Sequence, residues 1–158
     1  MKTWIIACTL GLAQLLGTAP ALAHGDNEHQ ITQVLKAQFE KPEAPLRVEP
    51  INVEDDFAVA GWSQGGRGGR ALLQRDKNHW FISICGGSGL TQADVLQTIG
   101  MGNAAAGKLA RAVVASESKL GADQRKLFDG FQGMLKVDPA ETHGNHAQHG
   151  QHAEPAKK

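Results

Sequence analysis

Cysteine is nearly absent from this 158-residue sequence, which contains only Cys8 and Cys85. Cys8 lies within segment 1–23, which has the features of a secretory signal peptide: a basic residue at Lys2, an apolar stretch, and an A-x-A cleavage motif at 21–23. Cleavage would leave Cys85 as the only cysteine, which excludes an intramolecular disulfide. Small secreted domains often depend on disulfides, so this one must be stabilised by a packed hydrophobic core.

Long hydrophobic runs and an excess of one charge are also lacking. The apolar stretch within 1–23 is too short and interrupted for a membrane span, and a retained N-terminal anchor is the alternative to cleavage. No second long apolar segment follows, so the mature protein, 24–158, is expected to be soluble. Without Lys2 the chain has 15 basic residues (16 minus one) and 16 acidic residues, a net charge of −1. It therefore has no basic excess for binding nucleic acid or an anionic membrane.

The hydrophobic pattern predicts a single α+β domain over 24–137. A helical stripe runs from Asp26 to Phe39 and ends at the proline-containing segment KPEAP. Four short β-type runs follow, separated by turn-forming clusters, and they indicate a four-stranded antiparallel meander: LRVEPINV, FAVAGW, RALLQR and HWFISIC. Pro50 marks the first strand as an edge strand or an interrupted one, and the glycines of GGRGG are expected to form a long hairpin turn.

Two or three helices are predicted after the sheet. A Thr91–Asp94 capping pair should begin a helix that stops at Gly100. Asn103 should cap the next helix, and the apolar spacing within 123–137 is also helical.

These helices are expected to cover one face of the sheet. In HWFISIC, the alternation places Trp80, Ile82 and Ile84 on the core face and Phe81 and Cys85 on the other. That other face would form a cleft, or would meet a second copy of the chain in a homodimer.

Histidine is concentrated in the C-terminal segment 138–158, which lacks large apolar side chains and is expected to be a flexible, disordered tail. Its stretch HGNHAQHGQHAE places a histidine at every third position, with small or hydrogen-bonding spacers between: His143, His146, His149 and His152. Imidazole binds Cu(II), Zn(II) and Ni(II), with affinity expected to peak at copper, and His-rich tracts are typical of metal binding. The alternative is a solubilising tail whose histidines have no role.

Two further residues are candidate metal ligands. His24 would follow the cleavage site, where its α-amine and imidazole together can chelate a copper ion. A copper enzyme of that kind needs a second histidine opposite the first, from His29 or His79; the alternative is that His24 merely follows the cleavage site. A Cys85 thiolate would suit Cu(I), whereas free cysteines are more often buried and inert.

No set of a nucleophile, a general base and an orienting residue is visible in the sequence. H-E-x-x-H and a close carboxylate pair in an apolar setting do not occur, so no enzymatic activity is predicted. The segment GGRGGRALL (65–73) is not a nucleotide-binding P-loop, because the Lys-Ser/Thr pair is missing and a strand follows where a helix is required. Arg67 and Arg70 within it are candidates for binding an anion.

Several segments in order carry a family resemblance: KPEAPL (41–46), AVAGWSQGGRGGRALLQR (58–75), WFISICGG (80–87) and LFDGFQGMLKV (127–137). Together with a signal peptide that ends just before His24, they resemble the small secreted proteins called copper uptake system-associated proteins. The resemblance covers nearly all of 24–137, and its most specific part is 61–73. It implies a periplasmic protein of Gram-negative bacteria linked to copper-transport genes, with no established catalytic activity. It provides no metal ligands for this chain, and the tail lies beyond it.

The sequence therefore predicts a periplasmic, non-enzymatic accessory protein that binds or handles copper. Its expected partners are the metal ion and a copper transporter or another periplasmic copper protein. The alternative function is an α+β module that binds a small ligand or a protein in the cleft of its sheet and carries an incidental metal-binding tail.

Overall fold

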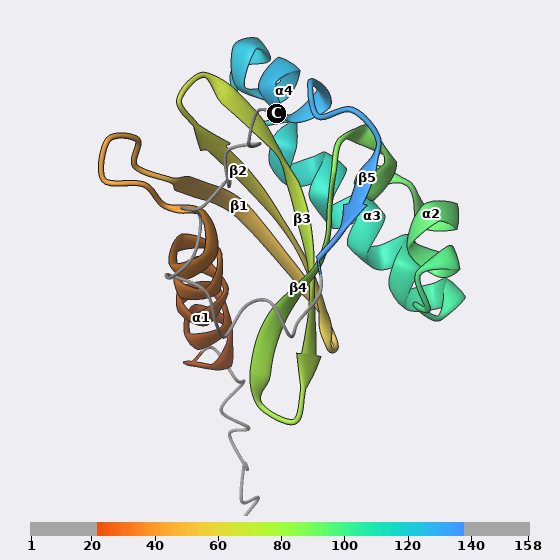
Figure 1. Cartoon of the computed structure of the whole chain (residues 1–158). Helices are drawn as coiled ribbons and strands as arrows, with labels where there is room; N and C mark the ends of the chain where they lie inside the picture. The colour runs from red at the N-terminus through yellow and green to blue at the C-terminus, as the bar shows by residue number, and fades with distance from the viewer. Residues whose placement is uncertain (1–21, 138–158) are drawn as a thin grey trace, which may run out of the picture.

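A five-stranded antiparallel sheet organises the chain in the computed structural model, which describes residues 22–137. The strands follow one another in space as in sequence: β1 (Arg47–Glu54), β2 (Phe57–Gln64), β3 (Arg67–Asp76), β4 (His79–Gly86) and β5 (Met134–Lys136). Helix α1 (Leu22–Phe39) precedes them, and four helical segments lie between β4 and β5: η1 (Ser88–Thr91), α2 (Ala93–Thr98), α3 (Asn103–Glu117) and α4 (Ala122–Asp129). Figure 1 shows this arrangement, which confirms the predicted α+β class. Most of the predicted signal peptide and the tail 138–158 lie outside the described residues.

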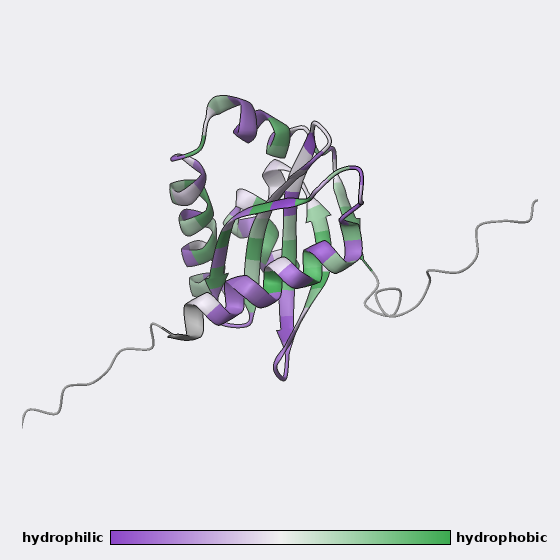
Figure 2. Ribbon diagram, turned by 90° about the vertical axis from the view of Figure 1, so that its left-hand side faces the viewer, coloured by the Kyte–Doolittle hydropathy of each residue, from purple (hydrophilic) through white to green (hydrophobic). Residues whose placement is uncertain are grey.

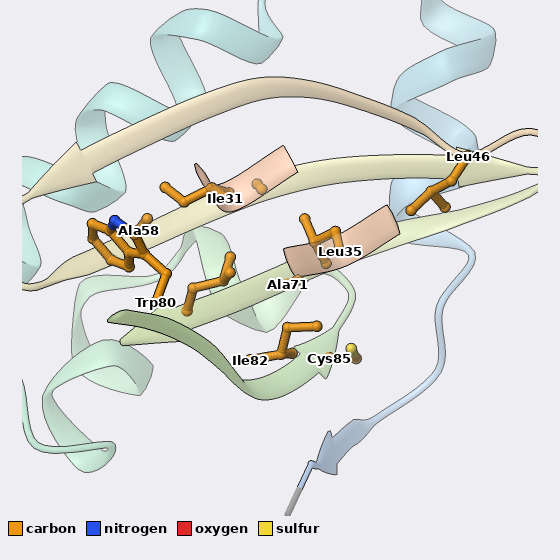
Figure 3. Packing of buried hydrophobic residues seen from close by; sticks show 10 residues of the cluster. Ile31, Leu35, Leu46, Ala58, Ala71, Trp80, Ile82 and Cys85 are labelled. Carbon is orange, nitrogen blue, oxygen red and sulfur yellow. The ribbon is translucent and has the colours of Figure 1, made fainter. Parts of the chain in front are cut away.

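Both faces of the sheet are covered, so the expectation that helices cover only one face is wrong. On one face, Ile31 and Leu35 of α1 pack on a cluster from four strands that includes Ala58, Ala71 and Ile82 (Figure 3). On the other face, α2 and α3 cover a second cluster, which contains Val59, Leu72, Ile84, Leu96, Leu109 and Val113. Figure 2 shows hydrophobic residues along the middle of the strands and a hydrophilic end at the β3–β4 hairpin. A homodimer through the sheet face stays a prediction, restricted to the part of that face that α1 leaves open.

The alternation of side chains along β4 is interrupted by a β-bulge. Leu73 pairs with Ile82 but the next residue back, Leu72, pairs with Ile84, so Ser83 is the extra residue. The Ser83 hydroxyl donates to the Leu72 carbonyl oxygen at 3.1 Å. As a result Cys85 shares the α1 face with Ile82, while Ile84 faces α3. The prediction that Ile82 and Ile84 lie on one face is therefore wrong.

Strand β1 is an edge strand and is also interrupted, as Pro50 predicted. Its pairing with β2 shifts register between Val48 and Ile51, and the Glu49–Pro50 peptide bond is cis. A proline at this position removes no hydrogen bond from the interior of the sheet, because β1 has no neighbour on its outer side.

The turn between β2 and β3 is shorter than expected. Only Gly65 and Gly66 form it, with φ of +56° and +77°, which is the conformation of a two-residue type I′ hairpin turn. Gly68 and Gly69 instead pair with Ser63 and Trp62 inside the β2–β3 ladder. The long glycine turn predicted over 65–69 is therefore wrong.

The helical regions after the sheet also differ from the predicted ones. Thr91 ends a 3₁₀ helix and its hydroxyl donates to Ser88, so the expected capping pair with Asp94 is not formed, and the N-cap of α3 is Gly102 rather than Asn103. The predicted helix over 123–137 ends at Asp129.

Beyond α4 the chain turns through two glycines and returns to the sheet as β5. Gly133 has a φ of +75°, which breaks the helical pattern at no steric cost. Cys85 then pairs with Leu135, and the Val137 amide donates to the Ser83 carbonyl oxygen at 2.9 Å. This returning segment forms one wall of the site described below.

None of the helices within 22–137 is both long and apolar enough to span a bilayer.

Candidate functional site

A groove of about 800 Å³ opens where α1 stops covering its face of the sheet. Its apolar walls come from segments that are far apart in sequence: Phe39 at the end of α1, Trp62 on β2, Leu127 on α4, Phe131 in the α4–β5 connection, and Leu135 and Val137 at β5. Cys85 also lines it, on the side of Ile82 away from Trp80 (Figure 3). The volume is within the range of small-molecule sites, roughly 300–1,000 Å³.

Two aromatic side chains define the centre of the groove. The rings of Trp62 and Phe131 meet edge to face, with centroids 6.1 Å apart and planes at 84°, an arrangement that aromatic pairs prefer. The indole Nε1 of Trp62 is buried and has no hydrogen-bond acceptor among the described residues. Buried indole N–H groups usually have a partner, because leaving one unsatisfied costs about 1–3 kcal/mol.

Gln64 fixes the end of α1 against the hairpin and so shapes the mouth of the groove. Its Nε2 donates to the carbonyl oxygens of Phe39 and Ala44, both at 2.8 Å. Phe39 is the last residue of α1, and Ala44 lies within the KPEAP segment that follows the helix. Gln64 therefore joins β2 to the α1–β1 connection.

Gly61 and Gly69 leave space for two aromatic side chains, one from α4 and one from the connection after it. A Cβ atom on Gly61 would lie 2.7 Å from the ring of Phe128, and one on Gly69 would lie 3.0 Å from the ring of Phe131. Gly61 pairs with Arg70, the neighbour of Gly69, so the two glycines face opposite sides of the sheet. The α4 segment therefore straddles the β2–β3 hairpin, and Phe131 reaches the groove.

Arg70 contacts α4 on the face of the β2–β3 hairpin that is opposite the groove. Its side chain is 3% exposed, and its guanidinium makes two parallel hydrogen bonds to Glu117, at 2.7 and 2.6 Å, and one to Asp129 at 3.1 Å. It also lies over the Phe128 ring, 5.6 Å from the centroid. Burial opposes the charge, but the two carboxylates outweigh it and raise the pKa of Arg70 above its ordinary value.

Arg70 is therefore already occupied by internal carboxylates, and the prediction that it binds an external anion is wrong. Arg67 is exposed and lines the groove, so for this residue anion binding stays a prediction.

The rim of the groove carries three exposed cations, Lys41, Arg67 and Lys126. No ion pair joins Lys41 or Arg67 to a carboxylate within 22–137, and Lys126 is 3.9 Å from an exposed Asp123. The one carboxylate lining the groove, Glu40, accepts hydrogen bonds from Lys36 and the Leu46 amide, which lower its pKa. The mouth of the groove is therefore net positive.

Cys85 is buried, 4% exposed, and has no disulfide partner within the described chain. Burial raises the pKa of its thiol from 9.0 to about 11, so the group is a neutral thiol at physiological pH. This confirms the expectation of a buried β-strand cysteine. Its predicted role as a metal ligand stays a prediction, since a metal would have to displace the thiol proton.

Alkylation of Cys85 at pH 8 should be at least about a hundredfold slower in the folded chain than in urea, because two pKa units reduce the thiolate fraction a hundredfold. The rate is followed with iodoacetamide and mass spectrometry of the peptide that contains Cys85. Equal rates in the two states would contradict the burial. The raised pKa also stabilises the fold below pH 9, a contribution that is lost as pH rises from 9 towards 11.

The predicted metal ligands of the tail cannot be placed. His143, His146, His149 and His152 lie outside the described residues, as does the side chain of His24. Between residues 22 and 137, no group of three or more His, Cys, Asp and Glu side chains is arranged to hold a metal ion.

The N-terminal part of α1 lies beside the start of β4, which no sequence pattern indicated. The Asn27 Oδ1 accepts hydrogen bonds from Trp80 Nε1 and from Arg75, both at 3.3 Å. His24 is one helical turn before Asn27 and His79 is next to Trp80, so the backbone positions of the two histidines belong to the same end of the domain. His29 is exposed and lines a shallow hollow against β1 instead.

No protein-family model, curated protein or solved structure matches this chain. Its function is therefore argued from the site itself.

Proposed function

We propose that this protein is a periplasmic, non-enzymatic accessory protein of copper handling, exported by a cleaved signal peptide, whose C-terminal histidines bind the metal. The observation that carries the proposal is the spacing of His143, His146, His149 and His152, three residues apart, with only small or hydrogen-bonding residues between them. Four imidazoles on one short segment can surround a single ion. The resemblance to copper uptake system-associated proteins supports copper as the metal.

The chemistry of imidazole sets the expected properties of this site. Neutral imidazole binds divalent ions in the order that peaks at copper, with zinc and nickel weaker. Protonated imidazole cannot coordinate, so metal affinity should fall as the pH drops through about 6.5. Ordering a segment of chain around the ion costs entropy, and the affinity should therefore be lower than that of a preformed pocket.

The number of residues between Val137 and the first tail histidine limits how far that histidine can be from the groove. His143 is six residues beyond Val137, which lines the groove. A fully extended chain spans at most about 3.3–3.6 Å per residue, so His143 lies within roughly 20 Å of Val137 in any conformation. A copper transporter or another periplasmic copper protein is the expected partner, and one that docks on this side of the domain would be within reach of the first tail histidine.

Titration of the full chain with Cu(II) should show about one bound ion, and replacement of the four tail histidines by alanine should lower the affinity at least about a hundredfold. The measurement is a competition titration against a chromophoric chelator at pH 7.4, repeated at pH 5.5, where binding should weaken.

The matched control is the double substitution His29→Ala with His79→Ala, which removes two exposed histidines of the domain and should leave the affinity unchanged. Copper binding that survives loss of the tail histidines but is abolished by the control would move the site to the folded domain. Absence of stoichiometric binding by the full chain would refute direct metal handling.

The groove favours a second function, which is independent of the metal. An apolar, partly enclosed cavity with a few polar groups at its mouth is the usual form of a small-ligand site. We propose that the folded domain is also a ligand-binding module. The same protein can combine both activities because the described lining of the groove comes from residues within 22–137, whereas the four metal-binding histidines lie beyond them in the sequence.

A further inference from the structure

We propose that the groove binds an anionic amphiphile, an unbranched apolar chain that ends in a carboxylate. This inference rests on the second proposed function, ligand binding by the domain. It does not depend on the histidines of the tail.

The walls of the groove select the apolar part of the ligand. Phe39, Trp62, Phe131, Leu135 and Val137 present aromatic and aliphatic surface, and Leu135 is 61% exposed although it is a large hydrophobic residue. Binding of an apolar ligand removes these side chains from water, which lowers the free energy of the complex. A flexible apolar chain can follow such a groove without a fixed pattern of hydrogen bonds.

The rim selects the charge of the ligand head. Lys41, Arg67 and Lys126 are exposed at the mouth, and the single carboxylate there, Glu40, is already paired with Lys36. A negative head group is therefore attracted and a positive one repelled. The planar guanidinium of Arg67 suits a carboxylate, which it can contact with two hydrogen bonds.

Trp62 provides an independent observation that points to an occupant. Its indole N–H is the one buried side-chain donor within 22–137 that has no acceptor, and the residue lines the groove. A ligand oxygen, or a water held beneath the ligand, would satisfy this donor.

The size of the groove favours a small ligand over a protein segment. Its volume of about 800 Å³ lies within the range of cavities that hold one small molecule. An acidic, apolar peptide is therefore the less favoured occupant, and its binding is an outcome of the experiment below.

Decanoate is the probe, titrated into ¹⁵N-labelled full chain and followed by amide chemical shifts, with 1-decanol as its uncharged analogue. We expect saturable shifts at groove residues and about fivefold weaker binding of 1-decanol, as expected for loss of a few exposed charge contacts. Absence of decanoate binding, with binding of an acidic, apolar peptide at the same residues, would overturn the amphiphile assignment. Equal affinity for decanoate and 1-decanol would overturn the assignment of an anionic head.

Two exposed aliphatic residues provide a matched pair of variants. Leu135→Asp places a charge in the groove and should weaken decanoate binding at least about tenfold. Val114→Asp makes the same change at a residue of α3 that is 54% exposed and does not line the groove, and it should have no effect. Equal losses in both variants would indicate nonspecific association of the amphiphile and would overturn the proposal.

Charge variants test the rim in the same way. Lys41→Gln combined with Arg67→Gln should weaken decanoate binding about fivefold and leave 1-decanol binding unchanged, and Arg111→Gln on α3 is the control.

Copper titration of the Leu135→Asp variant separates this proposal from the metal function. We expect this variant to retain copper binding and to lose decanoate binding. Absence of copper binding by the unmodified full chain, with decanoate binding intact, would refute the metal function alone.

Discussion

Replacement of Arg70 by leucine should lower the free energy of unfolding by about 3–5 kcal/mol, because it leaves a buried carboxylate without its partner. Arg70 is 3% exposed and Glu117 is 7% exposed at the side chain, so neither charge is solvated by bulk water. Both parallel hydrogen bonds to Glu117 and the contact with the Phe128 ring would be lost together. Urea unfolding followed by tryptophan fluorescence measures the change.

Two further variants separate the buried pair from its exposed neighbour. The double substitution Arg70→Leu with Glu117→Leu removes both charges and should recover much of the loss, since a buried ion pair is often no better than an apolar pair. Asp129 is 56% exposed, so Asp129→Asn should cost about 1 kcal/mol or less. If Arg70→Leu and Asp129→Asn proved equally mild, the buried ion pair would not be what fastens α3 and α4 to the hairpin.

Replacement of Gly61 by alanine should lower the free energy of unfolding by about 1–3 kcal/mol, because the added methyl group overpacks a filled site. A Cβ atom there would lie 2.7 Å from the Phe128 ring and also 2.7 Å from the Glu49 carbonyl oxygen. Phe128 is fully buried and the Glu49 oxygen belongs to the backbone, so neither can move without a shift of α4 or β1. The midpoint of thermal or urea unfolding reports the change.

Gly107→Ala is the matched control for this prediction. Gly107 lies inside α3, and a Cβ atom there would meet only the end of the exposed Arg111 side chain, at 3.3 Å, so the change should not destabilise the fold and should add about 0.5–1 kcal/mol of helix propensity. Equal stability of the two variants would mean that Phe128 does not need the space left by Gly61. A loss of stability at Gly61 alone would show that the missing side chain there makes room for Phe128 of α4. The position of α4 in turn fixes the wall of the groove.

The local elements of the fold are readable from sequence, because their signals are local. The helical stripe of Ile31, Val34 and Leu35 predicts α1. The turn-forming pairs Asp55-Asp56 and Lys77-Asn78, each between two β-type runs, predict two of the hairpin turns. The phase of β4 could not be read from sequence, because the extra residue at Ser83 is accommodated by pairing with β3, and the alternation of apolar residues appears unbroken.

The groove could not be predicted for a related reason. Phe39, Trp62 and Phe131 are distant in sequence, and only the return of the chain as β5 brings Phe131 to the wall. One signal in the sequence, the position of Arg70, does indicate how α4 is held. Arg70 lies between two glycines and an apolar run, and a cation in the middle of a buried strand requires carboxylate partners. The tail histidines, by contrast, are apparent from spacing alone, because their proposed chemistry needs no folded scaffold.

The central claim is that copper binds to the tail histidines and not to the folded domain. Amide spectra of the ¹⁵N-labelled full chain with substoichiometric Cu(II) test it most directly, because the paramagnetic ion broadens signals of nearby residues. Broadening should appear first at 143–152 and extend to residues near Val137, with the signals around Cys85, His29 and His79 affected less. Earlier or equal broadening at Cys85, or at His29 and His79, would place the ion in the domain and contradict the account.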